Sequence, residues 1–349
     1  MGLVWRRMGV LMESGEDKHK IDWRSGPDVT PRDPQPSNSG IVRPITGGFL
    51  SKGPLPIGAL LRGDSGQIYR ISEVLAARTK PLPSVYRASG ADRAKYIVKD
   101  MIKEEFHYQL HLQRPLSSCP NVRSVLDTIT EREMFVYPFL SGDLLRLGQR
   151  PLSTETRRHI LRDALQGLVD LHALHVLHND IKPNNILIDY DEGPGGKVNW
   201  LRGPLCGNAL WRSPKSWCRS RQNQASDLYS FGITMIYAMV NEIVFRVPDS
   251  QLNAADSWRH ILFRHISYVG DEEGVDGLLD HIGEESVFQQ RLIDLVGAFG
   301  PENPRQPLET WSYLDPDLRD LIGKMTRLDP TKRITAKEAL EHPWFGGRV

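Results

Sequence analysis

The amino-acid sequence predicts an α+β protein in which a strand-rich lobe is followed by a helix-rich lobe. Between residues 55 and 147 the apolar side chains follow a strand-like pattern that one helical stretch interrupts, and from Ser153 onward the pattern becomes helical. The chain has 349 residues, which is enough to bury a large core and to form two lobes. A cleft between two lobes is a common place for a small-molecule site.

The first 50 residues contain little that a fold could bury. Residues 14–51 are rich in Pro, Gly, Ser and Asp and show no apolar period, so we expect a disordered tail over residues 1–50. In the strand-rich lobe, Phe106 and Leu110 mark a helix that we expect to begin near Lys103 and to end near Pro115. Residues 134–137 predict a strand.

The helix-rich lobe is expected to open with a helix that Ser153 or Thr154 caps. Its apolar face consists of leucines at helical spacing, namely Leu161, Leu165, Leu168 and Leu171. Further on, residues 271–273 and 283–285 form acidic runs that we expect to be solvated surface.

Composition excludes several classes of protein. The 44 Lys and Arg residues against 43 Asp and Glu leave a formal charge of +1, which argues against a dedicated nucleic-acid binder. The longest apolar region, residues 231–247, is interrupted by Asn241 and Glu242, so we expect no membrane span. Three cysteines are too few for a disulfide framework and lack zinc-site spacing, which fits an intracellular protein of the cytoplasm or nucleus.

Residues 178–185, which read His-Asn-Asp-Ile-Lys-Pro-Asn-Asn, combine side chains suited to phosphoryl transfer. The carboxylate of Asp180 can orient an attacking hydroxyl and take its proton, and the ammonium of Lys182 can neutralise charge on the moving phosphoryl group. The amide oxygen of Asn185 can bind Mg²⁺. The segment matches H-R-D-x-x-x-x-N, so the sequence resembles the protein kinase superfamily. Lys182 favours the serine/threonine kinases, because tyrosine kinases usually lack this lysine.

This resemblance implies a bilobal protein-kinase-like fold that binds ATP between an N-lobe over residues 51–140 and a C-lobe over residues 141–349. Residues 63–68 resemble the second half of G-x-G-x-x-G-x-V, although Leu61 occupies the position of the first glycine. Gly63, Gly66 and Ile68 are therefore expected to lie against the phosphates of ATP, which backbone amides can approach closely at glycine.

Residues 96–99 resemble the V-A-I-K strand, which implies that Lys99 holds the α- and β-phosphates. The distance along the chain from Gly66 to Lys99 implies an inserted loop over residues 77–91. An active kinase pairs this lysine with a glutamate of the next helix. Here the helical pattern places Gln109 at that position and Glu105 one turn earlier. Either Glu105 reaches Lys99, or a weaker hydrogen bond replaces the ion pair.

Residues 134–143 resemble the hinge between kinase lobes. Backbone groups of Tyr137 and Phe139 would then face the adenine of ATP. Asp143 lies where many kinases have a ribose-binding acid, but it is equally well placed to cap a helix that begins at Leu144. Both interpretations remain open at this stage.

Three further segments of the C-lobe resemble kinase motifs in the expected order. Residues 211–215 resemble the end of the activation segment, normally A-P-E. Asp227 matches the D-x-W-S-F-G stretch, whose aspartate typically braces the catalytic loop backbone. Residues 329–345 resemble the last kinase helix. Together with the earlier motifs, the resemblance covers the chain from about Leu55 to Phe345.

The sequence departs from the family where the second metal ligand is expected. No Asp-Phe-Gly follows Asn185, and only 27 residues separate Asn185 from Ser213. The middle of the segment is missing, either because an exon was skipped or misassigned or because this is a pseudokinase. Asn185 alone cannot hold Mg²⁺. Asp189 and Asp191 are possible substitutes, but turn residues are the favoured interpretation of both.

Two other departures concern regulation and packing. Asn179 replaces the arginine of His-Arg-Asp, so regulation should not depend on that arginine reading a phosphate of the activation segment. Lys215 replaces the glutamate of A-P-E, whose usual partner corresponds to Arg333. Because an unpaired buried arginine is costly, we predict that Arg333 finds another acid or is partly exposed.

The resemblance implies transfer of the γ-phosphoryl group of ATP to Ser or Thr hydroxyls of a protein, with ATP and Mg²⁺ as cofactors. Asp180, Lys182 and Asn185 would be catalytic, and Asn185 would also bind the metal. The alternative is a pseudokinase that acts as a non-catalytic interaction module. In both cases the partner is a protein, with no nucleic acid and no membrane.

Overall fold

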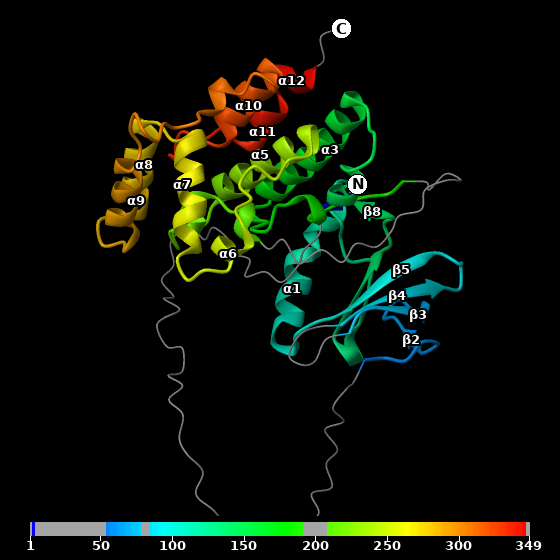
Figure 1. Ribbon diagram of the computed structural model, residues 1–349. Helices are drawn as coiled ribbons and strands as arrows, with labels where there is room; N and C mark the ends of the chain where they lie inside the picture. Colours follow the sequence, from blue (N-terminus) through cyan, green and yellow to red (C-terminus); the bar gives the residue numbers. More distant parts are fainter. Residues whose placement is uncertain (1, 4–53, 78–83, 191–207, 347–349) are drawn as a thin grey trace, which may run out of the picture.

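The fold of the chain is seen in a computed structural model, which describes residues 2–3, 54–77, 84–190 and 208–346. An antiparallel sheet of six strands with one helix forms the first part, and a bundle of helices forms the second (Figure 1). The predicted α+β fold, strand-rich and then helical, is confirmed.

The sheet has the strand order β2-β3-β4-β5-β7-β6. The bounds are β2 Leu60–Arg62, β3 Ile68–Ala76, β4 Val85–Gly90, β5 Lys95–Asp100, β6 Asp127–Ile129 and β7 Met134–Pro138. The expectation of an inserted loop over residues 77–91 is wrong for its described part, because β4 occupies residues 85–90 and pairs with both β3 and β5. The predicted strand at residues 134–137 is confirmed as β7.

The two edges of this sheet are joined by the turn between β2 and β3. The backbone N–H of Asp64 donates to the carbonyl of Thr128 on β6 at 2.7 Å. The buried carboxylate of Asp127 accepts from the N–H of Ser65 at 3.1 Å and from the hydroxyl of Tyr69 at 2.9 Å. The sheet is therefore rolled around its own apolar core, which includes Leu61, Tyr69, Ile71, Tyr86, Val98, Ile129 and Val136.

Gly63 lies where this turn meets Asp127, and only glycine fits there. A Cβ atom at Gly63 would lie 1.9 Å from Oδ2 of Asp127 and 2.9 Å from the ring of Tyr69. We expect Gly63→Ala to lower the free energy of unfolding by about 1–3 kcal/mol, because the carboxylate must shift from its donors. Urea denaturation measures this. The control Gly297→Ala, where no atom lies within 4 Å of the added Cβ, should not destabilise the protein.

Helix α1, Phe106–Gln113, covers one face of the sheet, where Phe106 packs with Phe135 and Tyr137 (Figure 1). It follows a short 3₁₀ turn over Lys103–Glu105 and is followed by another over Pro115–Ser118. The predicted helix between Lys103 and Pro115 is confirmed, with a tighter turn at each end.

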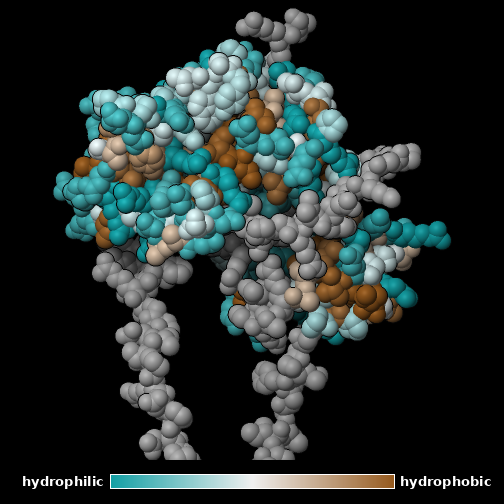
Figure 2. All heavy atoms as spheres, viewed as in Figure 1, coloured by the Kyte–Doolittle hydropathy of each residue, from teal (hydrophilic) through white to brown (hydrophobic). Residues whose placement is uncertain are grey.

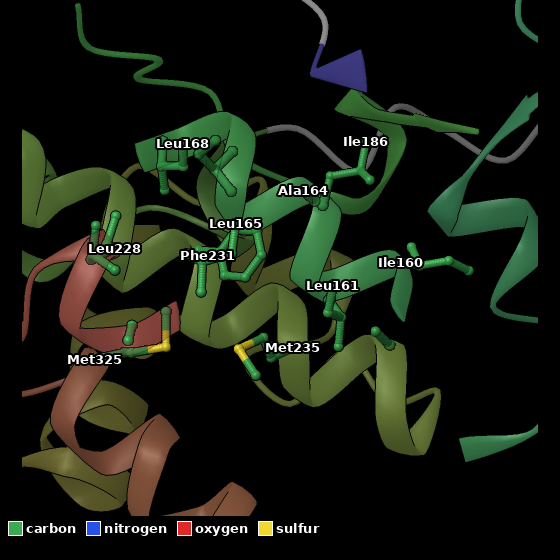
Figure 3. Close-up of a cluster of buried hydrophobic side chains, with 14 of the residues drawn as sticks. Ile160, Leu161, Ala164, Leu165, Leu168, Ile186, Leu228, Phe231, Met235 and Met325 are labelled. Carbon is green, nitrogen blue, oxygen red and sulfur yellow. The ribbon is translucent and has the colours of Figure 1, made fainter. Parts of the chain in front are cut away.

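The helical part is centred on two long helices, α3 Thr154–Ala173 and α5 Gln224–Val240. Ser153 caps α3, as expected, by accepting from the N–H of Thr156. The side chains between α3, α5 and α10 form the largest apolar core (Figure 3). The other helices are α2 Leu144–Leu147, α4 Pro214–Trp217, α6 Asp249–Leu252, α7 Ser257–Val269, α8 Glu272–Ile282, α9 Phe288–Gly297, α10 Pro316–Met325, α11 Ala336–Leu340 and α12 Pro343–Gly346.

A small sheet lies next to α3. It has the order β1-β9-β8, with bounds β1 Gly2–Leu3, β8 Gly142–Asp143 and β9 Ile186–Ile188. Strand β9 follows residues 178–185 directly, so this sheet anchors the end of the candidate catalytic segment. No helix among the described residues combines the length and apolarity needed to cross a membrane.

The surface of the helical part is largely hydrophilic in the view of Figure 2. Asp271, Glu272 and Glu273 at the start of α8 are exposed, as are Glu284 and Glu285. The expectation of solvated acidic surface holds at these positions.

A second apolar core beneath α7 contains the fully buried His265. Its Nδ1 lies 2.6 Å from the hydroxyl of Tyr229, and Phe245 stacks on its ring. Burial lowers the pKa of His265 from 6.5 to about 3. The unfolded chain therefore takes up a proton near pH 6.5 that the folded chain does not, and stability falls as the pH falls.

We expect His265 to contribute a loss of roughly 2 kcal/mol in the free energy of unfolding between pH 7 and pH 5. Urea denaturation at both pH values measures this loss, and His265→Gln should remove that part of the pH dependence. His111→Gln, at an exposed position, should leave it intact. An unchanged pH dependence in His265→Gln would contradict the prediction.

Candidate active site

The backbone of the candidate catalytic loop is held by the carboxylate of Asp227, which α5 carries in its first turn. Asp227 is 1% exposed and accepts from the N–H groups of His178 and Asn179, each at 2.7 Å. Nε2 of His172 lies 3.2 Å from the same carboxylate. The expected bracing role of Asp227 is confirmed, and its two hydrogen bonds fix the loop where Asn179 has a φ of +56°, a left-handed conformation that asparagine adopts more readily than most residues.

Asp180, Lys182 and Asn185 converge in this loop. The ammonium of Lys182 donates to the carboxylate of Asp180 at 2.9 Å. Nδ2 of Asn185 donates to the carbonyl of Asp180 at 2.7 Å and to its carboxylate at 2.8 Å. All three side chains are less than 9% exposed, so the carboxylate is held by two donors in a largely dry environment.

This arrangement suits transfer of a group to a hydroxyl. A carboxylate in a fixed position can accept the proton of an incoming hydroxyl, and a neighbouring ammonium can stabilise negative charge that develops on the transferred group. Asp180 lines a small cavity together with Ile181, Trp211 and Arg212, of which the last two precede α4.

Lys99 lies on β5, opposite Phe135 of β7 and Val85 of β4. It shares the face of β5 with Ile97, which packs against the cluster beneath α1, so Lys99 is directed to the α1 side of the sheet. On α1, Gln109 is buried, whereas Glu105 is partly exposed just before the helix. Of the two candidates, the buried residue is thus the amide and not the acid.

The carbonyl of Pro138, at the end of β7, accepts hydrogen bonds from Arg123, a contact that the sequence analysis did not predict. Nη2 and Nε of Arg123 donate to the carbonyl oxygen of Pro138 at 2.6 and 3.1 Å. The guanidinium also lies 4.8 Å from the centre of the Tyr137 ring. Arg123 is only 9% exposed, and burial lowers its pKa to about 10. The available sequence signal was a single charge in the apolar stretch of residues 122–126.

The backbone of the predicted hinge is oriented differently from our expectation. The N–H of Phe139 donates to the carbonyl of Lys95 on β5 at 3.3 Å, so it is not available to a ligand. Backbone groups alternate in direction along a strand, so those of Tyr137, which pairs with Ile97, also face β5. The carbonyls of Val136 and Pro138 face the opposite side, where Val136 accepts from the N–H of Leu126.

Gly63 and Gly66 lie at the turn between β2 and β3, which contacts β6, and Ile68 is the first residue of β3. Two strands, β3 and β4, separate this turn from β5, which carries Lys99. In kinases the lysine lies on the third strand, after the glycine-rich loop. In this chain the hairpin immediately before β5 consists of β3 and β4. The residues that connect these two strands, 77–84, include no glycine, and most of them lie outside the described residues. The structure therefore does not place these glycines next to Lys99, contrary to the expectation.

Asp143 caps α2, because its carboxylate accepts from the N–H of Arg146 at 3.0 Å. Of the two interpretations, the capping role is the one that the contacts demonstrate. The side chain remains partly exposed.

The described residues do not make a complete site for Mg²⁺. Asn185 retains its amide oxygen for a metal, but no group of three His, Cys, Asp or Glu among the described residues could hold one. Asp189 is exposed and accepts from the hydroxyl of Ser141, and Asp191 lies outside the described residues. Because Mg²⁺ needs carboxylate ligands in addition to water, the donor set among the described residues does not fit this metal.

Lys215 stands where A-P-E has its glutamate, and the acceptors of Arg333 are backbone carbonyls. Arg333 is 7% exposed and donates to the carbonyls of Arg327, Ala225 and Leu328, at 2.9, 2.6 and 3.2 Å. Lys215 is buried and donates to Asn223. The prediction that Arg333 finds another acid or is partly exposed is therefore wrong: backbone carbonyls satisfy the guanidinium instead.

Comparison with known proteins gives one consistent result. The family model described as the protein kinase domain matches residues 62–345. Human mitogen-activated protein kinase 13 is 27% identical over 278 residues, which are 76% of this chain and 69% of that protein. Cell division control protein 2 homolog 3 of Trypanosoma brucei brucei is 26% identical over 242 residues, 65% of this chain and 73% of that protein. The fold is similar to that of the MAP kinase LmaMPK10 of Leishmania major, with a TM-score of 0.59, 18% identity, and coverage of 80% of this chain and 84% of that one.

Proposed function

This chain belongs to the protein kinase domain family, and from that premise we propose that it transfers the γ-phosphoryl group of ATP to Ser or Thr hydroxyls of a protein. The observation that carries the proposal is the assembled group of Asp180, Lys182 and Asn185, which Asp227 holds from α5. A contiguous motif could match by chance, but these mutual hydrogen bonds are what the chemistry requires.

In the proposed reaction, Asp180 accepts a hydrogen bond from the substrate hydroxyl and takes its proton as the oxygen attacks the γ-phosphorus. The new O–P bond forms while the bond from the γ-phosphorus to the β–γ bridging oxygen breaks, and ADP leaves with that oxygen. Lys182 stabilises the charge on the transferred phosphoryl oxygens. Asn185 fixes the carboxylate of Asp180 in its reactive orientation.

In this proposal the nucleotide lies between an N-lobe of residues 51–140 and a C-lobe of residues 141–349. Lys99 contacts its α- and β-phosphates from the face of β5 beneath α1. Asp143 contacts the ribose while it caps α2. The described residues lack the second acid that would hold a metal beside the nucleotide.

The test is incorporation of labelled phosphate from ATP into a panel of Ser- and Thr-containing peptides. We expect activity in the wild-type chain and a loss of at least about a hundredfold in Asp180→Asn, which keeps the shape but removes the base. If the wild-type chain and Asp180→Asn give the same signal, the proposal fails. The unfolding temperature of the variant is measured alongside and must lie above the assay temperature, so that a loss reports chemistry and not unfolding.

The second candidate is a non-catalytic binding module, and the contact between Arg123 and Pro138 favours it. The carbonyl of Pro138 is the hinge group that faces away from β5, and an adenine amino group would need such an acceptor. A buried cation already satisfies it. Calorimetric titration of the wild-type chain with ATP decides: absence of binding up to millimolar nucleotide supports the module and excludes the phosphotransferase.

A further inference from the structure

A groove of about 480 Å³ lies between α4, the start of α7 and the start of α9. Arginines from three separate segments line it: Arg212 before α4, Arg219 after α4 and Arg291 on α9. Trp217 and Trp258 form its walls. The helices α6, α7 and α9 lie at one end of the helical part (Figure 1).

The three arginines are exposed, and two of them are fixed against aromatic rings. The guanidinium of Arg212 lies 5.6 Å from the Trp217 ring, and that of Arg291 lies 4.7 Å from the Trp258 ring. A guanidinium held over a ring keeps the N–H donors at its edge directed outward, and it loses less freedom when it binds an anion. None of the three forms an ion pair with another described residue.

The third arginine is held in a strained conformation. Arg219 has a φ of +57°, in the left-handed region that disfavours side chains other than glycine, asparagine and aspartate. Strain of this kind persists where the surroundings impose it, and it is often found at ligand sites. At Arg219 it places a third positive charge on the same groove.

No aspartate or glutamate lines the groove, so its charge is purely positive. Asp256, Glu284 and Glu285 come close along the chain, just before Ser257 and Val287, but they are not part of the lining. The complementary ligand therefore carries carboxylates or phosphates.

The groove lies next to the candidate active site. Arg212 and Ser216 line both this groove and the small cavity that contains Asp180. A peptide whose hydroxyl reaches Asp180 can therefore extend over Arg212 toward Arg219 and Arg291.

We propose that this groove binds an acidic segment of the protein partner, adjacent to the hydroxyl that reaches Asp180. The role of this partner as a phosphoryl acceptor rests on the proposed function. Binding of the acidic segment itself needs no phosphoryl transfer. Carboxylates of Asp and Glu and a phosphate on Ser share the required chemistry, and the experiment separates these sources.

Binding is measured by fluorescence anisotropy of labelled peptides on the full chain, without nucleotide, so that failure of phosphotransfer cannot hide it. One peptide has a serine followed by several Glu residues, a second has Gln in their place, and a third has phosphoserines. We expect the Glu and phosphoserine peptides to bind at least about tenfold more tightly than the Gln peptide, with an advantage that shrinks as salt increases. Whichever of the two binds more tightly identifies the source of the charge.

The variants Arg219→Asn and Arg291→Gln remove two of the three charges, and asparagine tolerates the φ of residue 219. Together they should weaken binding of the acidic peptides about tenfold or more. The matched control is Arg259→Gln on α7, which is exposed and lines a different cavity. Equal affinity for all three peptides, or equal effects of the control and the double variant at unchanged unfolding temperature, would overturn the proposal.

Discussion

Replacement of Arg123 with valine is expected to strengthen nucleotide binding about tenfold or more. In the wild-type chain the guanidinium donates two hydrogen bonds to the carbonyl of Pro138 and is almost completely buried. An adenine amino group must compete with both of them for this acceptor. Hydrogen bonds of a charged donor contribute about 1.5–3 kcal/mol each, and 1.4 kcal/mol corresponds to a factor of ten in affinity. Valine cannot donate, so it leaves the acceptor available.

Calorimetric titration with ATP and with adenosine measures this change. Arg132→Val, at an exposed position on the turn before β7, is the matched control and should leave the affinity unchanged. The same affinity in Arg123→Val and the wild type, with both folded, would mean that Arg123 does not compete with the nucleotide. A gain with adenosine as well as with ATP would locate the effect at the base and not at the phosphates.

Replacement of Asp227 with alanine is expected to lower the free energy of unfolding by about 3–5 kcal/mol. The carboxylate is buried and satisfies two backbone N–H groups of the catalytic loop, and it lies against His172. Alanine leaves those donors unsatisfied in a dry interior, where each costs about 1–3 kcal/mol. The loop that carries Asp180 then loses its attachment to α5.

Urea denaturation of Asp227→Ala, of Asp227→Asn and of the exposed control Asp280→Ala measures the effect. Asparagine retains one oxygen acceptor, so we expect a loss between those of alanine and of the wild type. The control should stay within about 0.5 kcal/mol of the wild type. A loss below about 1 kcal/mol for Asp227→Ala would show that the loop holds its shape by other contacts. Both candidate functions depend on this fold, so the result applies to either.

Much of the fold was predictable because its signals are local. The leucines of α3 repeat at helical spacing and Ser153 precedes them, so the helix and its cap follow from neighbouring residues. The α1 helix and strand β7 were predictable for the same reason. The expectation of an inserted loop over residues 77–91 was wrong because it took the turn with Gly63 and Gly66 as the last turn before the lysine strand. That left no place for β4, which pairs with β5.

The candidate site likewise has a part that the sequence predicted and a part that it did not. Asp180, Lys182 and Asn185 lie within six positions of one another, and their convergence follows from one short loop. The roles of Gly63 and Gly66 were predicted from a short pattern, but a hairpin's place depends on the strands that it joins. The role of Arg333 was inferred from charge alone, which ignores backbone carbonyls as acceptors.

The sequence by itself determined the family, the order of the lobes and the catalytic loop, because each is encoded by residues that are close together in the chain. Only the tertiary structure decided which hinge carbonyls face away from β5 and that Arg123 binds the carbonyl of Pro138, because both depend on which side of β7 pairs with β5. It also decided that Arg212, Arg219 and Arg291 meet in one groove, since helix packing brings together charges up to 79 positions apart. Pairing and packing are long-range choices, and no local pattern of residue types encodes them.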